Sequence, residues 1–215
     1  MNRKDLLLSW YETLYASLGP SNWWPGESAF EIAVGAILTQ NTSWTNACKA
    51  ITQLRQHNLL QPEAMDRLSS EELALLIRPA GYFRVKAARL KNFLYFLNAE
   101  CNYDLSILKK MDTWRLRLQL LEIKGIGPET ADSILLYALD KPSFVVDAYT
   151  KRILNRHSLV HEDIHYHELR DVFMDNLPED VTLYNEYHAL LVRACKTWCA
   201  KKTPHCVKCP LQLYL

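Results

Sequence analysis

The sequence Ile-Lys-Gly-Ile-Gly-Pro-Glu occupies residues 123–129 and lies between two apolar segments of helical character. One helix is expected to end near Leu121, and Pro128 suits the first position of the next. A Gly-x-Gly turn adopts backbone conformations closed to residues with a Cβ and lets another molecule approach closely. The N–H groups and positive dipole end of the following helix favour an anion. The segment is therefore either a hairpin that binds a phosphate or a tight interhelical turn without a ligand.

Helical periodicity recurs along the rest of the chain, and no segment alternates apolar and polar residues over the length of a strand. Apolar stripes at helical spacing occur at residues 30–38, 87–97, 114–121 and 131–138. Asp112, Pro128 and Ser69-Ser70 before Glu71-Glu72 are expected helix starts. We therefore predict an all-α fold of about ten helices joined by short loops.

Composition excludes several classes of protein. Of the 215 residues, 49% are apolar and 23% are charged, which is ordinary for a globular chain. The first 20 residues form a helical stripe and lack the cleavage site of a signal peptide. No apolar run approaches the length of a membrane span. We expect a cytoplasmic protein without a membrane partner.

The net charge of +1 does not by itself indicate a nucleic-acid-binding protein. The distribution of charge is more informative, because no acidic residue follows Glu186 whereas five basic residues do: Arg193, Lys196, Lys201, Lys202 and Lys208. A local basic patch is compatible with binding a polyanion at one place. A solvated basic end of the chain is the alternative interpretation.

A wider set of motifs resembles the endonuclease III-like superfamily of helix-hairpin-helix DNA glycosylases. Its members have a Gly-(apolar)-Gly hairpin, then Thr-Ala, then Val-Asp about twenty residues further on. Here these are residues 125–127, 130–131 and 146–147. Residues 38–42 and 81–87 resemble the loops that enter DNA in that family, so Gln40 and Tyr82 are candidates for filling the space left by a flipped base. The resemblance covers residues 22–210 and implies that Lys124, Gly125, Ile126 and Gly127 contact a DNA phosphate, with a possible bridging monovalent cation.

Asp147 is the candidate catalytic residue. Cleavage of an N-glycosidic bond develops positive charge on the sugar, which a fixed carboxylate stabilises while it orients or deprotonates water. Asp147 is predicted to begin a helix over residues 147–157, and a helix N-terminus favours the ionised form of a carboxyl group. Capping that helix is the simpler role, and the two roles are compatible.

The resemblance also indicates the type of glycosylase. Family members that cleave the strand use a lysine two residues after the second glycine as a Schiff-base amine. That position is Glu129 here, and a carboxylate cannot form an imine. The chain is therefore expected to be monofunctional and to leave an abasic site, with Lys124 as a phosphate contact and Glu129 at the edge of the base pocket.

The chain resembles most closely a subgroup of 3-methyladenine DNA glycosylases within that superfamily. The shared residues are Trp-Trp-Pro at 23–25 and an aromatic residue at position 44. An alkylated purine carries positive charge, which aromatic faces attract while they stack on the base. Trp24 and Trp44 are therefore candidates for holding a flipped base, which must leave the duplex before its glycosidic bond is accessible. Burial of both tryptophans in the core is the alternative.

Four of the six cysteines cluster as Cys195-x3-Cys199-x6-Cys206-x2-Cys209. In an intracellular protein this spacing suggests a metal site rather than disulfides. The family often holds a [4Fe–4S] cluster on a Cys-x6-Cys-x2-Cys-x5-Cys pattern, whose fourth position falls on Leu215 here. Cys195 lies one helical turn before Cys199 and is the expected substitute ligand. A zinc site including His205 and a metal-free relic are the alternatives.

Taken together, these features predict two helical lobes. One spans residues 24–133 and includes the hairpin; the other combines residues 1–23 with 134–215. The expected function is that of a monomeric base-excision-repair glycosylase that acts on damaged double-stranded DNA at the nucleoid. A bifunctional glycosylase/lyase for oxidised pyrimidines and a non-catalytic, DNA-binding iron-sulfur protein are the competing interpretations.

Overall fold

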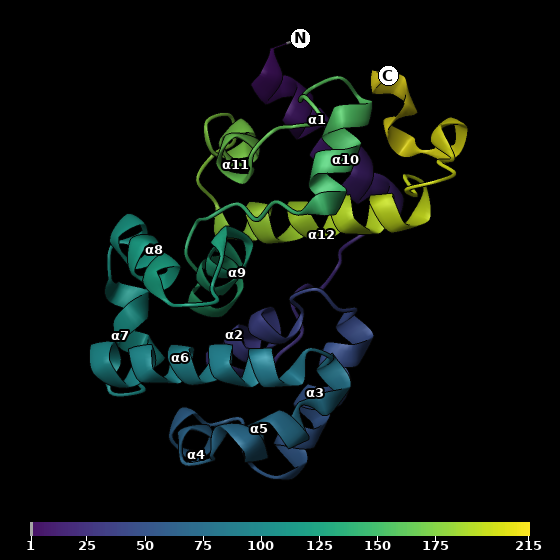
Figure 1. Cartoon of the computed structure of the whole chain (residues 1–215). Helices are drawn as coiled ribbons and strands as arrows, with labels where there is room; N and C mark the ends of the chain where they lie inside the picture. Colours follow the sequence, from purple (N-terminus) through teal and green to yellow (C-terminus); the bar gives the residue numbers. More distant parts are fainter. Residues whose placement is uncertain (1) are drawn as a thin grey trace. The chain divides into compact units, whose positions relative to one another are not determined.

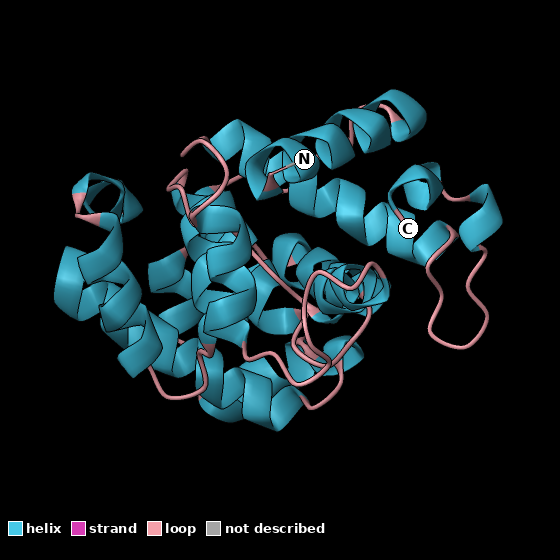
Figure 2. Ribbon diagram, turned by 90° about the horizontal axis from the view of Figure 1, so that it is seen from above, coloured by secondary structure: helices cyan, strands magenta, loops and turns pink. Residues whose placement is uncertain are grey.

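The computed structural model describes residues 2–215, and in that range the chain forms helices and loops without a strand (Figure 2). This confirms the predicted all-α fold class. The helices, labelled in Figure 1, are α1 Arg3–Leu18, α2 Ala29–Leu38, α3 Trp44–Gln56, α4 Pro62–Asp66, α5 Ser70–Leu76, α6 Phe83–Cys101, α7 Leu105–Lys110, α8 Thr113–Glu122, α9 Pro128–Ser133, α10 Ala148–Arg156, α11 Tyr166–Met174 and α12 Val181–Thr197. Short helical turns are η1 Arg78–Ala80, the π-helical η2 Ile134–Ala138, η3 Cys206–Lys208 and η4 Pro210–Tyr214. No helix in residues 2–215 is long and apolar enough to cross a membrane.

The predicted helix starts are present. Asp112 caps α8 by accepting the Arg115 N–H at 2.8 Å. Ser69 caps α5 in a reciprocal box with Glu72, and Pro128 is the first residue of α9. Each of these caps satisfies backbone groups that have no partner inside the helix, so local sequence determines where these helices begin.

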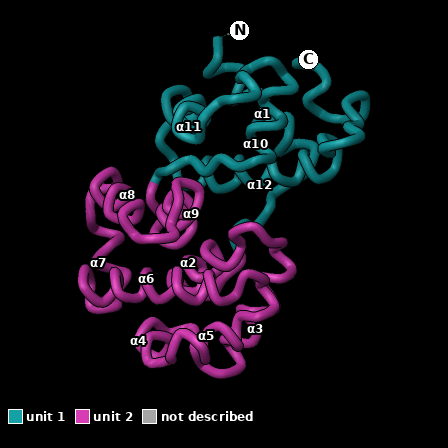
Figure 3. The backbone as a smooth tube through the Cα atoms, in the orientation of Figure 1, with its two compact units in different colours: residues 1–24, 142–215 teal, residues 25–141 magenta. Residues whose placement is uncertain are grey.

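The chain divides into two compact units (Figure 3). One comprises residues up to Trp24 together with Pro142–Leu215, and the other comprises Pro25–Lys141. The predicted boundary at 133/134 therefore differs from the observed one at 141/142. The reason is that α9 continues directly into η2, whose apolar side chains pack against α2 in the second unit.

In the unit of residues 25–141, the buried helix α2 packs against α3, α6, α9 and η2. The long helix α6 is covered by α4 and α5, as Figure 1 shows. An ion pair inside this unit joins α8 to α9: Arg117 Nε and Nη2 donate to Asp132 at 2.7 and 3.0 Å. Both side chains are buried, so each compensates the desolvation of the other.

In the other unit, α1 packs against α12 and η4 although almost the whole chain separates them. Leu7, Trp10 and Leu14 of α1 are fully buried. The Tyr187 hydroxyl donates to the Leu7 carbonyl at 2.8 Å, and Arg193 donates to the carbonyl of Gly19 at 2.8 Å. These contacts explain why the N-terminal helix belongs with the C-terminal part of the chain.

Candidate active site

The hairpin of residues 123–127 joins α8 to α9 within the unit of residues 25–141. Ile126 is buried, and its N–H donates to the Ile123 carbonyl at 2.9 Å. Gly125 has a φ of +98°, which a residue with a Cβ rarely adopts. Gly127, at φ −91°, precedes Pro128 and caps α9. The turn is thus held by its isoleucines, while Lys124, Gly125 and Gly127 face solvent.

Three side chains support the hairpin, one from the turn after α2 and two from α6. Gln40 Nε2 donates to the Gly125 carbonyl at 3.1 Å and to Thr130 Oγ1 at 2.8 Å. Arg89 Nη1 donates to Gln40 Oε1, and Asn92 Nδ2 donates to the Lys124 carbonyl at 2.8 Å. Gln40, expected to enter DNA, is therefore hydrogen-bonded to the hairpin. The sequence analysis missed Arg89 and Asn92; their i, i+3 spacing on α6 is compatible with a shared face but does not identify the partner.

Two exposed loop tips are anchored by a single buried lysine. Lys86 is 1% exposed, and its Nζ donates to the Leu38 carbonyl at 2.9 Å and the Ala80 carbonyl at 2.7 Å. Burial lowers the pKa of Lys86. Just beyond these two carbonyls lie Asn41 and Tyr82, both with positive φ and both exposed, Tyr82 to 71%. The segments expected to enter DNA thus share one internal support, which the sequence analysis did not identify.

The three candidate base-pocket residues belong to different units. Trp44 begins α3 and is half-buried against the core of residues 25–141. Glu129 is exposed in the first turn of α9. Trp24 belongs to the other unit, is half-buried, and meets Trp23 edge-on at a centroid distance of 5.7 Å. The sandwich of a base between Trp24 and Trp44 stays a prediction.

Asp147 caps α10, as predicted, and its two carboxylate oxygens have different surroundings. Oδ1 accepts the Thr150 N–H at 2.8 Å and the Thr150 hydroxyl at 3.0 Å. Oδ2 lies 3.7 Å from His188 Nε2 of α12. Burial raises the pKa of Asp147, but His188 and the Thr150 hydrogen bonds outweigh it and bring the pKa below its ordinary value. Asp147 is therefore a partly buried carboxylate that is ionised at neutral pH, which is the form that stabilises positive charge on a sugar.

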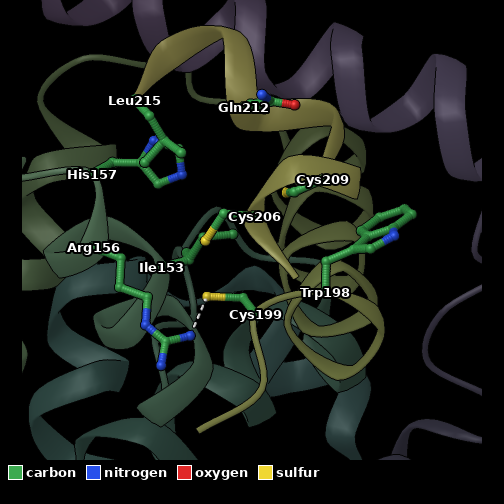
Figure 4. A pocket seen from close by; sticks show the side chains of 9 residues that line it. All are labelled: Ile153, Arg156, His157, Trp198, Cys199, Cys206, Cys209, Gln212 and Leu215. Carbon is green, nitrogen blue, oxygen red and sulfur yellow. Dashed lines mark hydrogen bonds between the residues drawn. The ribbon is translucent and has the colours of Figure 1, made fainter. Parts of the chain in front are cut away.

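The C-terminal cysteines lie around one small cavity (Figure 4). Cys199, Cys206 and Cys209 line it together with Arg156, His157 and Leu215. Cys199 Sγ is 3.1 Å from Arg156 Nη1, the contact dashed in Figure 4. A hydrogen bond with Cys195 lowers the pKa of Cys199 to about 6 against the effect of burial, and Arg156 contributes in the same direction.

Cys195 lies beside this group but has a second partner, since its thiol donates to the Tyr149 carbonyl at 3.2 Å. Within residues 2–215, no three His, Cys, Asp or Glu side chains are gathered closely enough to hold a metal ion. Leu215 lines the cavity at the position where the family pattern has its fourth cysteine. As arranged here, the side chains do not fit a four-cysteine cluster, and the [4Fe–4S] site stays a prediction of the sequence.

The basic residues near the C-terminus divide into two kinds. Arg193 has a structural role, because it donates hydrogen bonds to the carbonyls of Leu18 and Gly19 and to Ser21 Oγ. Lys201, Lys202 and Lys208 are exposed on the cysteine loop, as is Lys196 on α12. Four of the five basic residues therefore remain accessible to a polyanion.

Comparison with known proteins identifies the arrangement. Residues 34–179 match the model of the HhH-GPD superfamily of base excision DNA repair proteins. The chain belongs to this superfamily. A protein of Methanocaldococcus jannaschii, provisionally named a DNA repair glycosylase, is 46% identical over 98% of this chain and 96% of its own length. Endonuclease III of Sulfolobus acidocaldarius is 27% identical over 87% of this chain and 81% of its own.

Two solved structures extend the comparison to the fold. The 3-methyladenine DNA glycosylase MagIII of H. pylori, bound to 1,N6-ethenoadenine, matches with a TM-score of 0.77 at 25% identity, over 91% of this chain and 98% of that one. A trapped endonuclease III–DNA covalent intermediate matches with a TM-score of 0.83 at 20% identity, over 100% and 96% of the two chains. The chain is thus a base-excision DNA glycosylase with the helix-hairpin-helix glycosylase fold.

Proposed function

We propose that this glycosylase is monofunctional and that it releases an alkylated purine, such as 3-methyladenine, from double-stranded DNA. The observation that carries this proposal is the state of Asp147, a partly buried carboxylate with one oxygen used for capping and a pKa below its ordinary value. In the reaction the C1′–N bond breaks, its electron pair leaves with the base, and positive charge develops on the sugar. The Asp147 carboxylate stabilises that charge and accepts a proton from the attacking water.

The absence of a lyase step is supported by Glu129. This residue occupies the place of the Schiff-base lysine in the family's hairpin, and its exposed carboxylate cannot attack the sugar to form an imine. Lys124 is exposed on the opposite side of the two glycines and serves in this proposal as a phosphate contact. The expected product is therefore an intact strand with an abasic site.

The choice of an alkylated purine is supported by the tryptophans and by one relative. Trp24 and Trp44 are each half-buried, so neither is fully enclosed in the core. Aromatic faces attract the positive charge of an alkylated base as well as stacking on it. The H. pylori structure, at 25% identity, is that of a 3-methyladenine glycosylase bound to a modified adenine.

For DNA binding, we propose that the hairpin of residues 124–127, in which Lys124, Gly125 and Gly127 are exposed, contacts a phosphate, with a monovalent cation completing the site. Gln40 would act on DNA indirectly, by fixing the Gly125 carbonyl and the start of α9. Tyr82, which is exposed beyond the Ala80 anchor, is the proposed side chain that fills the space left by the flipped base. The protein is expected to do this as a monomer.

The test is incubation with duplexes that carry a single methylated, oxidised or deaminated base. We expect strand breaks with methylated purine only after alkali, no borohydride-trapped adduct, and no base release by Asp147→Asn. The matched control is Asp180→Asn, because Asp180 also caps a helix but lies exposed immediately before α12. That variant should retain wild-type rates.

Other results would point to the competing functions. Breaks without alkali, together with a trapped adduct, would replace the proposal by a glycosylase/lyase. An Asp147→Asn protein that releases base as fast as wild type would remove Asp147 from the mechanism. DNA binding without release of any base would indicate a non-catalytic role.

A further inference from the structure

The two oxygens of Asp147 are divided between a local contact and a distant one. Oδ1 is used by Thr150, three residues along the chain, whose N–H and hydroxyl both donate to it. Oδ2 faces His188, which comes from α12 and is 41 positions away in sequence. Because Thr150 already satisfies the capping geometry, His188 is not needed to begin α10.

His188 is placed as a fixed neighbour of this carboxylate. Its side chain is only 6% exposed and that of Asp147 is 14% exposed, so water screens the pair weakly. The 3.7 Å between Nε2 and Oδ2 is longer than a good hydrogen bond, yet short enough for the imidazole to lower the pKa of Asp147. The residues beside His188 on α12, Tyr187 and Ala189, are fully buried, so this part of α12 lies in the core.

We infer that His188 is a positioning residue that fixes Oδ2 of Asp147 and keeps the carboxylate ionised. This inference rests on the proposed catalytic role of Asp147. The imidazole presents an N–H to Oδ2 and leaves the negative charge on Asp147. That oxygen then faces the developing charge on the sugar with a defined direction, while Oδ1 remains in the cap. A buried histidine that only fills space would have neither effect.

The ionisation of Asp147 provides a readout of this role. Burial alone raises the pKa of Asp147, and His188 is the largest influence that lowers it. The other groups that lower the pKa of Asp147 are the N–H and hydroxyl of Thr150 on α10. The charge of Asp147 in turn raises the pKa of Cys195 on α12. Removing the imidazole should therefore move the pKa of Asp147 upward, and the ionised fraction should fall about tenfold for each pH unit below that pKa.

The experiment compares wild type with His188→Leu and His188→Gln, with Tyr187→Phe as the matched control. Tyr187 precedes His188 and donates to the Leu7 carbonyl, so its substitution perturbs the same helix without touching Asp147. Three quantities are measured for each protein. They are the single-turnover rate of base release between pH 5 and 8, the affinity for a duplex with an abasic-site analogue, and the titration of the Asp147 carboxyl carbon by NMR.

We expect His188→Leu to release base at least about tenfold more slowly, with a loss that grows as pH falls and an unchanged affinity for the abasic analogue. The Asp147 titration should shift to higher pH. His188→Gln keeps an N–H donor and should recover most of the rate, and Tyr187→Phe should match wild type in pH profile. An unchanged Asp147 titration in His188→Leu would overturn the inference, whatever the activity. If Asp147→Asn releases base normally while the titration shifts, the proposed catalytic role has failed and the Asp147–His188 contact stands.

Discussion

Substitution by alanine should have a different effect at each of the two hairpin glycines, Gly125 and Gly127. A Cβ at Gly125 would lie 2.4 Å from Arg89 Cγ, and the φ of +98° there strains any other residue. A Cβ at Gly127 would meet nothing within 4 Å. Gly125→Ala should therefore destabilise the folded protein. Gly127→Ala should leave stability unchanged and affect only the surface expected to contact DNA.

The size of the Gly125→Ala effect follows from two contributions. Backbone strain of this kind costs about 1 to 3 kcal/mol, and forcing a methyl group into an occupied space costs about 1 to 3 kcal/mol more. Arg89 can move only by giving up its hydrogen bond to Gln40, which itself binds the Gly125 carbonyl. At about 2 to 4 °C per kcal/mol for a chain of this size, we expect Tm to fall by roughly 4 to 24 °C.

Gly127→Ala should leave Tm unchanged and weaken DNA binding. One charge-assisted hydrogen bond to a phosphate is worth about 1.5 to 3 kcal/mol, which corresponds to roughly ten- to hundredfold in affinity. The assays are thermal unfolding and fluorescence anisotropy with an undamaged duplex over a range of salt concentrations. A Gly125→Ala protein as stable as wild type, or a Gly127→Ala protein that binds DNA as tightly, would refute the reasoning about that glycine.

Three further predictions concern the interior and the cysteines. Asp132→Ala leaves Arg117 buried without its partner and should cost about 3 to 5 kcal/mol of unfolding free energy, measured with urea; a variant as stable as wild type would contradict the ion pair. Lys86→Met leaves two loop carbonyls without their donor, and base release should fall further than affinity for undamaged DNA; equal losses would indicate a general fold defect. If the predicted [4Fe–4S] cluster forms, anaerobically purified protein should be brown, and Cys195→Ser should lose iron while Cys48→Ser keeps it. Colourless, iron-free wild-type protein would exclude the cluster.

The capping residues in the sequence were sufficient to predict where helices begin. Which face of a helix is buried depends on packing between helices. Asp112 and Ser69 were identified as helix starts because a cap is completed within three residues. The apolar stripe assigned to residues 114–121 was wrong in its orientation. Trp114 and Leu118 are 59% and 45% exposed, while Leu116 and the charged Arg117 are buried. Arg117 can be buried only because Asp132 meets it from α9, and no pattern within α8 shows that partner.

The same distinction applies to the candidate site. The hairpin and the capping role of Asp147 were predictable because each lies in a continuous segment of sequence. The contacts of Gln40 with the hairpin and of His188 with Asp147 join residues 85 and 41 positions apart, respectively. Such contacts depend on how the helices pack. A single sequence shows which side chains are present but not which of them meet. The sequence therefore indicated the candidate catalytic group but not the residues that contact it.

The geometry of Asp147 makes its capping and catalytic roles separable. Oδ1 accepts two hydrogen bonds from Thr150, and an amide oxygen at the same place accepts them as well. Asparagine therefore keeps the cap and removes the charge, whereas alanine removes both and costs about 0.5 to 2 kcal/mol of stability in addition. The cap fixes Oδ1, and His188 lies 3.7 Å from Oδ2, so each oxygen has its own neighbour. The capping residue of α10 thus has the property that transition-state stabilisation requires, a charge that is oriented before the substrate arrives.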